Sequence, residues 1–300
     1  MSAPVAFVQP IRSVDTEITY LTPGSFINRR YAAPGVEVNT GTYQPYPVKI
    51  GDARPTKEQF TLDSHGFVLA EHKSAVKDFF NNDEVGDVYQ KEVEDIVKRL
   101  SGADLVVLQG WMVRTSGDLS KRQQKKVVGY AHQGGVQPPA SEAHVDFTPD
   151  SAESRAKDLF QRTYPNEKPY KRFMATSLWR TFSPPPQDWP LAICDGSSVS
   201  REEEATNVLV IVDEIPDREA MLVDLPNEKD LPAATIFRHS PKHRWWYYSK
   251  MNRDEVILLK FYDSDHSRAW RAPHTAFHDP SFPNARVRES IEVRTIAYFL

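Results

Sequence analysis

A histidine and an aspartate two residues apart, His144 and Asp146, are well suited to bind a metal. On a β-strand, side chains at positions i and i+2 point to the same face, so this imidazole and this carboxylate would lie side by side. With a second histidine from a distant strand they would form the two-histidine, one-carboxylate site of non-haem Fe(II) oxygenases, which leaves coordination positions open for a co-substrate and O2.

The second histidine is expected in the C-terminal segment 271–299, which holds two candidates, His274 and His278. They precede Arg288 by fourteen and ten residues, so either can lie one strand away from that arginine. Two further histidines, His239 and His243, rank below them because no arginine and serine follow at a suitable distance. The residues alone leave the choice between His274 and His278 open.

A charged face is expected on the strand that begins at Arg288. Strand alternation places Arg288, Ser290, Glu292 and Arg294 on one side, and a face with two arginines is a poor apolar core. Arg288 with Ser290 can bind the distal carboxylate of 2-oxoglutarate through a charge-assisted, bidentate contact. The alternative is an edge strand whose charges face solvent.

An aromatic run near residue 245 offers a candidate substrate pocket. Trp245 and Tyr247 fall on a short expected strand, where they either pack in the core or line a pocket for an apolar or aromatic substrate. The chain has no phosphate-binding glycine loop and no Gly-x-Ser-x-Gly motif. These absences disfavour nucleotide-dependent enzymes and serine hydrolases.

Composition describes an ordinary globular protein and limits its partners. The chain has 300 residues, 40% of them hydrophobic, and a formal charge of -4, which provides no general attraction to nucleic acid or to an anionic membrane. The basic stretch Lys121–Lys126 is therefore expected to be a solvated loop. With no apolar run of about 20 residues and no signal-peptide pattern, we expect a cytoplasmic protein that acts on a small molecule. The sequence indicates no particular oligomeric state.

The single cysteine, Cys194, excludes an internal disulfide and a cysteine-based zinc site. Histidine and carboxylate side chains are then the available ligands for a catalytic metal. A metal in this protein is therefore expected to be bound through nitrogen and oxygen.

Helices are expected at a few places only. Helical periodicity is strongest from Asp87 to Leu100, and a shorter helix is expected at Ala75–Phe80. Another is expected to begin near Asp150, because Asp150 and Glu153 fit a capping box.

The C-terminal half is instead rich in short β-branched and aromatic runs separated by turn residues. These runs are Asn207–Val212, Thr235–Phe237, Arg244–Tyr248, Val256–Tyr262 and Ile291–Phe299. The spacing leaves no room for the crossover helices of a parallel α/β fold. We expect a mainly β protein with flanking helices, a double-stranded β-helix or jelly roll. It would be a single domain over residues 1–300, with N-terminal strands and helices in 1–105 and the jelly-roll core in 106–300.

From about Val48 onward, a series of short segments occurs in a specific order. They are Gly51–Arg54, Leu62–Phe67, His144–Asp146, Trp179–Arg180, Trp189–Asp195, His243–Trp245, Lys260–Ser264, Pro273–Phe277 and Arg288–Arg294. Together they resemble the fungal AsaB-type hydroxylase/desaturase family, which is related to the 7α-cephem-methoxylase chain and to gibberellin desaturase-like proteins.

The resemblance implies a double-stranded β-helix oxygenase that uses Fe(II), 2-oxoglutarate and O2 to hydroxylate or desaturate a natural product of fungal secondary metabolism. It favours His274 over His278, since the family's histidine lies in the Pro-His-Thr-Ala-Phe pattern. It also implies Arg180 as a substrate contact. The alternative is an iron-dependent oxidase or dioxygenase that does not use 2-oxoglutarate, against which Arg288 and Ser290 argue.

The chain departs from the family at two positions. The family commonly has an asparagine two residues before its Trp-Arg pair, where this chain has Ser177, and often an Asp-His pair in place of Gly110-Trp111. These departures affect contacts to the substrate or co-substrate, whereas the iron ligands match without exception.

Overall fold

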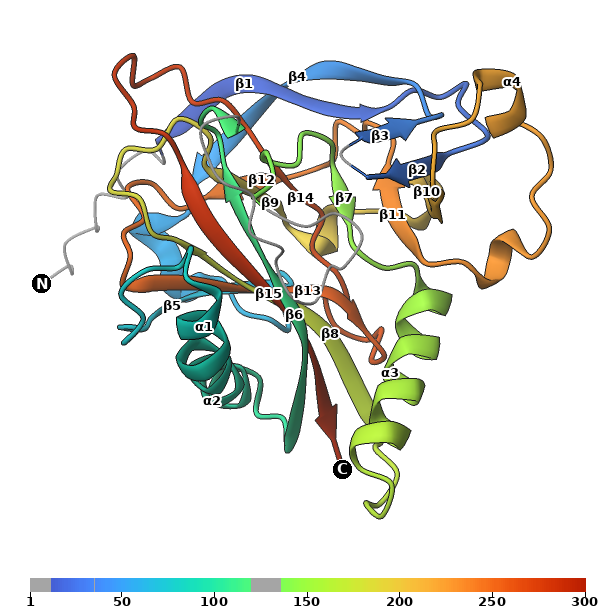
Figure 1. The fold of residues 1–300 in the computed structure, drawn as a ribbon. Coiled ribbons are helices and arrows are strands. Elements are labelled where there is room, and N and C mark those ends of the chain that lie inside the picture. The colour runs from blue at the N-terminus through green and yellow to red at the C-terminus, as the bar shows by residue number, and fades with distance from the viewer. Residues whose placement is uncertain (1–11, 35, 120–135) are drawn as a thin grey trace, which may run out of the picture.

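Two β-sheets form the framework of the computed structural model, which describes residues 12–34, 36–119 and 136–300 (Figure 1). The larger, or major, sheet has the strand order β1 (Ser13–Leu21), β4 (Tyr43–Asp52), β12 (Trp245–Tyr247), β9 (Leu191–Cys194), β14 (His274–Ala276), β7 (His144–Val145), β11 (Ala233–Phe237), β10 (Glu204–Ile211), β2 (Arg29–Ala33) and β3 (Val36–Asn39). The smaller, or minor, sheet has the order β5 (Phe67–Glu71), β13 (Glu255–Asp263), β8 (Arg172–Thr181), β15 (Glu289–Phe299) and β6 (Leu105–Thr115). The expected mainly β jelly roll is confirmed.

The minor sheet is covered on both faces. Along β8, Ala175 and Trp179 belong to one hydrophobic cluster and Met174 and Leu178 to another, as strand alternation requires. The second cluster also contains the apolar face of helix α2 (Gln90–Ser101). One face of β8 therefore packs against the helix, and the other faces the interior that holds the candidate metal ligands.

The helix expected at 87–100 is confirmed. It continues a short helix, α1 (Asn82–Glu84), through a π-helical turn at Val85–Tyr89, and it ends at Gly102 in the left-handed region with φ of 72°. A glycine adopts this conformation without the steric cost of a Cβ atom. In the described part of the chain the other α-helices are α3 (Pro149–Thr163) and α4 (Arg218–Met221), and 3-10 turns lie at Arg54–Gln59, Gly196–Ser198, Arg201–Glu203 and Glu228–Asp230.

The short helix expected at Ala75–Phe80 is wrong, because the segment is irregular in the structure. Its backbone groups are bound by side chains instead of by a helical ladder. Glu84 accepts from the amide of Lys77, and the guanidinium of Arg253 donates to carbonyl groups of the segment. The apolar spacing that indicates a helix here serves only to bury two side chains, Val76 and Phe79.

Helix α3 follows the candidate metal ligands directly, as expected, but its cap differs from the prediction. Thr148 is the N-cap: its hydroxyl accepts from the amide of Ser151 at 3.2 Å, and the Ser151 hydroxyl accepts from the amide of Thr148 at 2.8 Å. Pro149 occupies the first helical position, where its missing N–H costs nothing. The helix therefore begins one residue before Asp150.

The basic stretch Lys121–Lys126 lies outside the described residues. Among the helices in the described ranges, none combines the length and the apolar character needed to cross a bilayer.

Candidate metal centre

His144, Asp146 and His274 converge between the two sheets. His144 on β7 and His274 on β14 are paired residues of neighbouring antiparallel strands, and their ring centroids are 4.5 Å apart. Asp146 follows β7 directly. One ligand atom from each of the three residues lies within 4.8 Å of the other two, and the arrangement suits a single metal ion. His278 is exposed on the loop after β14 and lies outside this group.

Both imidazole rings are oriented by backbone carbonyl groups. The Nδ1 atom of His144 lies 2.8 Å from the Glu142 carbonyl oxygen, and that of His274 lies 3.3 Å from the Ala272 carbonyl oxygen. A proton on Nδ1 leaves Nε2 free to bind a metal. Burial and the neighbouring His144 lower the pKa of His274 to about 3, so this ring is neutral, as a metal ligand must be.

The two oxygens of Asp146 have different partners. Oδ1 lies 3.4 Å from Nε2 of His144, whereas Oδ2 forms an ion pair with Nε of Arg294 at 2.7 Å. Burial alone would raise the pKa of Asp146, but the charge of Arg294 and the contact with His144 outweigh it and hold the pKa below its usual range. Asp146 is therefore a carboxylate whose Oδ1 faces the histidines.

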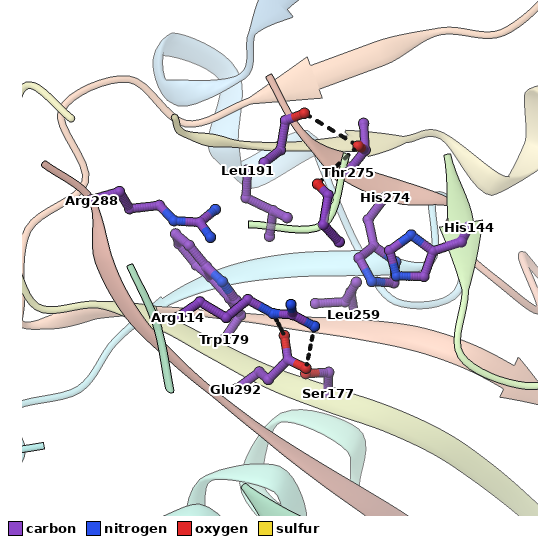
Figure 2. A pocket seen from close by; sticks show the side chains of 12 residues that line it. Arg114, His144, Ser177, Trp179, Leu191, Leu259, His274, Thr275, Arg288 and Glu292 are labelled. Atoms are coloured by element: carbon purple, nitrogen blue, oxygen red, sulfur yellow. Dashed lines mark hydrogen bonds and ion pairs between the residues drawn. The ribbon is translucent and has the colours of Figure 1, made fainter. Parts of the chain in front are cut away.

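Further charged residues extend this arrangement along β15. Arg294 lies 3.6 Å from Glu292, which pairs with Arg114 of β6 through contacts of 3.2 and 3.3 Å (Figure 2). Arg288, Ser290, Glu292 and Arg294 lie on the inner face of the strand, as alternation predicts. Sequence reasoning gave no role to Glu292, Arg294 or Arg114, and for Arg114 the sequence held no signal.

A small cavity lies beside the ligands, between the two sheets. Its lining residues are Arg114, Ala140, His144, Ser177, Trp179, Leu191, Leu259, His274, Thr275, Ala276, Arg288 and Glu292. Figure 2 shows the two histidines at one end of this cavity and the guanidinium of Arg288 at the other, beside Trp179. The cavity thus joins the candidate metal ligands to the expected co-substrate anchor.

Arg288 is buried with unused hydrogen-bonding capacity. Its Nη1 donates to the Trp189 carbonyl at 3.1 Å, but Nε and Nη2 have no protein partner, and neither has the buried hydroxyl of Ser290. Burial, with a smaller effect from the charge of Arg114, lowers the pKa of Arg288 to about 9. Buried donors without partners are costly, so these atoms fit an anionic ligand such as the distal carboxylate of 2-oxoglutarate.

The backbone at Arg288 is fixed by the residue after β6 and by the loop before β9. The Arg288 amide donates to the Ser116 hydroxyl at 2.8 Å and to Asp188 Oδ1 at 2.9 Å, and Ser116 also donates to Asp188 at 2.7 Å. This cluster holds the start of β15 and directs the Arg288 side chain inward.

The expected substrate contacts lie away from the cavity. Trp245 and Tyr247 on β12 belong to a hydrophobic cluster with β1 and β4, and Trp245 Nε1 donates to the Tyr20 hydroxyl at 2.7 Å. Arg180 points to the outer face of the minor sheet, where it donates to the Tyr89 hydroxyl at 3.1 Å and to the His72 carbonyl at 2.9 Å. Packing accounts for Trp245 and Tyr247, although the buried Tyr247 hydroxyl has no hydrogen-bond partner, and internal hydrogen bonds account for Arg180.

The lower-ranked histidines lie elsewhere too. His243 contacts Glu203 at 2.8 Å and the Tyr20 hydroxyl at 3.0 Å, and His239 stacks on Tyr46 with ring centroids 4.3 Å apart.

Proteins similar to this chain in sequence or fold include Fe(II)- and 2-oxoglutarate-dependent enzymes. Residues 15–298 match the family described as Oxidoreductase/YMDC permease-like domain. The Fe(II)/2-oxoglutarate-dependent dioxygenase nvfI of Aspergillus novofumigatus is 30% identical over 300 residues, which cover 97% of this chain and 94% of that protein. The hydroxylase/desaturase efuI of Hormonema carpetanum is 31% identical over 263 residues, which cover 86% of this chain and 85% of that protein.

A solved structure, that of the iron and alpha-ketoglutarate-dependent endoperoxidase NvfI, matches with a TM-score of 0.75 at 25% identity and covers 96% of this chain and 98% of that one. A match over 96% of the chain includes both the major sheet, which carries the candidate ligands, and the minor sheet. On the strength of its fold and of relatives matched over most of their length, this chain belongs to the fungal AsaB-type hydroxylase/desaturase family of Fe(II)/2-oxoglutarate-dependent dioxygenases.

Proposed function

We propose that His144, Asp146 and His274 hold Fe(II) and that Arg288 and Ser290 bind 2-oxoglutarate in this oxygenase. One observation carries the proposal: the cavity lined by His144 and His274 is also lined by Arg288, whose Nε and Nη2 have no protein partner. 2-Oxoglutarate can chelate a metal through its keto acid end and carries a second carboxylate at its other end. The metal-ligand group would face the first end, and the buried guanidinium of Arg288 would face the second.

Each residue then has a distinct role. Bound Fe(II) supplies the activation of O2 that couples oxidation of 2-oxoglutarate to oxidation of the substrate. Arg288 orients the co-substrate through its distal carboxylate, and Ser290 adds a hydrogen bond. The apolar side chains of Trp179, Leu191 and Leu259 limit water in the cavity and so strengthen these charge-assisted contacts.

We infer that the substrate is a small natural product and that the outcome is hydroxylation or desaturation. The relative efuI is a hydroxylase/desaturase, which supports this inference, and the endoperoxidase NvfI indicates that a related scaffold also serves another oxidation. The cytoplasmic location and the absence of nucleic-acid and membrane partners stay predictions.

The alternative, an iron oxidase that does not use 2-oxoglutarate, gives no role to the buried donors of Arg288. In such an enzyme the unpaired guanidinium would be a net cost to stability with no ligand to offset it. The dependence of the relative nvfI on 2-oxoglutarate also argues against it.

Arg288→Ala tests the proposal directly. Removal of the guanidinium leaves a desolvated carboxylate without its partner, a loss of about 2 to 5 kcal/mol in co-substrate binding. This loss corresponds to an affinity for 2-oxoglutarate about thirtyfold to several thousandfold lower. The measurement is an anaerobic titration of the Fe(II) protein with 2-oxoglutarate, followed by the visible absorption band of the chelated keto acid.

Two further variants serve as controls in this titration. Arg288→Lys keeps the charge without the planar fork, so it should recover only part of the affinity. Arg286→Ala removes an exposed arginine two residues away and should titrate like wild type. If Arg288→Ala also titrates like wild type, Arg288 does not anchor 2-oxoglutarate. If wild type shows no absorption band of the chelated keto acid, the alternative of an iron oxidase that does not use 2-oxoglutarate is favoured again.

A further inference from the structure

A second arginine, Arg114, lines the cavity that Arg288 shares with the two histidines. It lies on β6 opposite Ser290 of β15, so both side chains point to the inner face of the minor sheet. Figure 2 shows its guanidinium in the middle of the cavity, between Arg288 and the rings of His144 and His274. A keto acid that reaches from the metal ligands to Arg288 would therefore lie beside Arg114.

The guanidinium of Arg114 keeps donors available for a ligand. Its Nε and Nη2 donate to Glu292 at 3.2 and 3.3 Å, and its Nη1 donates to the Pro138 carbonyl at 2.9 Å. A guanidinium has five N–H groups. Acceptors among the described residues therefore take three of them and leave one on each Nη atom.

Two like charges lie close together in this cavity. After burial, the charge of Arg114 is the largest effect that lowers the pKa of Arg288, so the two guanidinium groups repel each other. Glu292 offsets the charge of Arg114, but Arg294 shares this carboxylate at 3.6 Å. Two buried cations side by side are costly unless an anion compensates them. 2-Oxoglutarate carries two carboxylates, one for each guanidinium.

Arg114 lies toward the metal end of the cavity and stays charged there. Burial alone would lower its pKa, but the charge of Glu292, the hydrogen bonds to it and the charge of Asp146 together raise the pKa above its ordinary value. The charge of a candidate metal ligand thus acts on Arg114. Arg288, at the other end, is the better placed of the two for the distal carboxylate.

We propose that Arg114 binds the carboxylate of 2-oxoglutarate that adjoins the keto group, while Arg288 binds the distal carboxylate. Glu292 holds the Arg114 guanidinium in position for this contact. The two arginines then recognise different features, since every 2-keto acid has the first carboxylate and only some have the second. The inference rests on the proposed function, because it takes 2-oxoglutarate as the occupant of the cavity.

The test compares 2-oxoglutarate with 2-oxovalerate, which has the same keto acid end and no distal carboxylate. Each is titrated anaerobically into the full chain saturated with Fe(II), and the visible absorption band reports binding. Arg114→Gln should weaken both keto acids by the same factor, about tenfold to a hundredfold, because each loses a charge-assisted contact. Arg288→Ala should weaken 2-oxoglutarate alone and so bring the two affinities together.

Arg114→Lys keeps the charge without the planar fork and should recover part of the affinity for both keto acids. If Arg114→Gln fails to fold, Arg114→Lys gives the same comparison with a smaller loss.

Glu292→Gln separates a direct contact from a structural ion pair. This change leaves the Arg114 guanidinium in the cavity with its charge less compensated, so both keto acids should bind at least as tightly as they bind to wild type. If Arg114 matters only as the partner of Glu292, the Arg114→Gln and Glu292→Gln variants should weaken binding alike. That result overturns the proposal.

Two further results would also contradict the assignment of Arg114. Arg114→Gln might titrate like wild type with both keto acids, or it might weaken 2-oxoglutarate alone. Either result, with a normal wild-type band, overturns this inference and leaves the proposed function standing. The absence of a band with either keto acid in wild type would overturn the proposed function and this inference with it.

Discussion

At the residue scale, the candidate metal ligands are held by groups that do not bind the metal themselves. Backbone carbonyls orient both imidazoles, and Arg294 engages Oδ2 of Asp146 while Oδ1 faces His144. Such outer contacts fix the geometry of a ligand before the metal arrives. A carboxylate engaged at one oxygen is set to bind iron through the other.

The role of Arg294 leads to a prediction on iron binding. Arg294→Leu leaves Asp146 free to rotate and removes the compensating charge, so the affinity for Fe(II) should fall about tenfold to a hundredfold. Arg294→Lys should keep part of that affinity, because it retains the charge. The measurement is an anaerobic Fe(II) titration with a competing chelator, and an affinity unchanged in Arg294→Leu would contradict the positioning role.

The choice between the two C-terminal histidines gives a second prediction. His274→Ala removes one of three protein ligands, and bound iron after anaerobic purification should fall to background. His278→Ala changes an exposed ring outside the group and should retain wild-type iron. Metal analysis by mass spectrometry decides, and equal iron loss in both variants would show that His274 is the wrong choice.

Local spacing predicted part of this site. The His144 and Asp146 pair is a two-residue pattern, and alternation from Arg288 to Arg294 put four polar side chains on one face. The contact between Arg294 and Asp146 could not be predicted, because it depends on how the two sheets pack against each other. The Arg114 contact to Glu292 likewise requires the register of β6 against β15.

At the element scale, strands with an unbroken β-branched or aromatic run were predictable, and strands whose run is interrupted by polar residues were less so. The five C-terminal runs correspond to β10, β11, β12, β13 and β15. The central strand β8 gave no such signal, because its polar residues, Thr176 and Ser177, break the apolar run. The short ligand strands β7 and β14 owe their form to pairing with longer neighbours.

Helix α3 provides the element-scale prediction. The capping box of Thr148 and Ser151 satisfies amides at the helix start, so Thr148→Ala should lower the free energy of unfolding by about 1 kcal/mol. Thr148→Ser keeps a hydroxyl acceptor and should lower it much less. Urea unfolding followed by circular dichroism measures both, and equal loss in the two variants would mean that the threonine methyl group, and not the cap, stabilises the helix.

At the scale of the whole molecule, early and late parts of the sequence are interleaved in one sheet. β1 and β4 form one end of the major sheet and β2 and β3 the other, with strands from residues 144–276 between them. The expected division at residue 105 separates segments in sequence that are neighbours in space. We propose that the described residues form a single folding unit, in line with the single domain expected from the sequence.

A core substitution on β1 tests whether the described residues unfold as one unit, because β1 is far in sequence from the candidate site. Ile18 is 1% exposed and packs in a cluster with Trp245 and Phe277, so Ile18→Ala should cost about 2 to 5 kcal/mol. If the chain is a single unit, this loss lowers the midpoint of the whole unfolding transition. Tryptophan fluorescence and far-UV circular dichroism should then give the same lowered midpoint. Trp179 reports on the minor sheet and Trp245 on the major sheet. Glu17→Ala, an exposed change on the same strand, should leave the midpoint in place. Two separate transitions, only one of which moves in Ile18→Ala, would show that the N-terminal strands fold apart from the jelly-roll core.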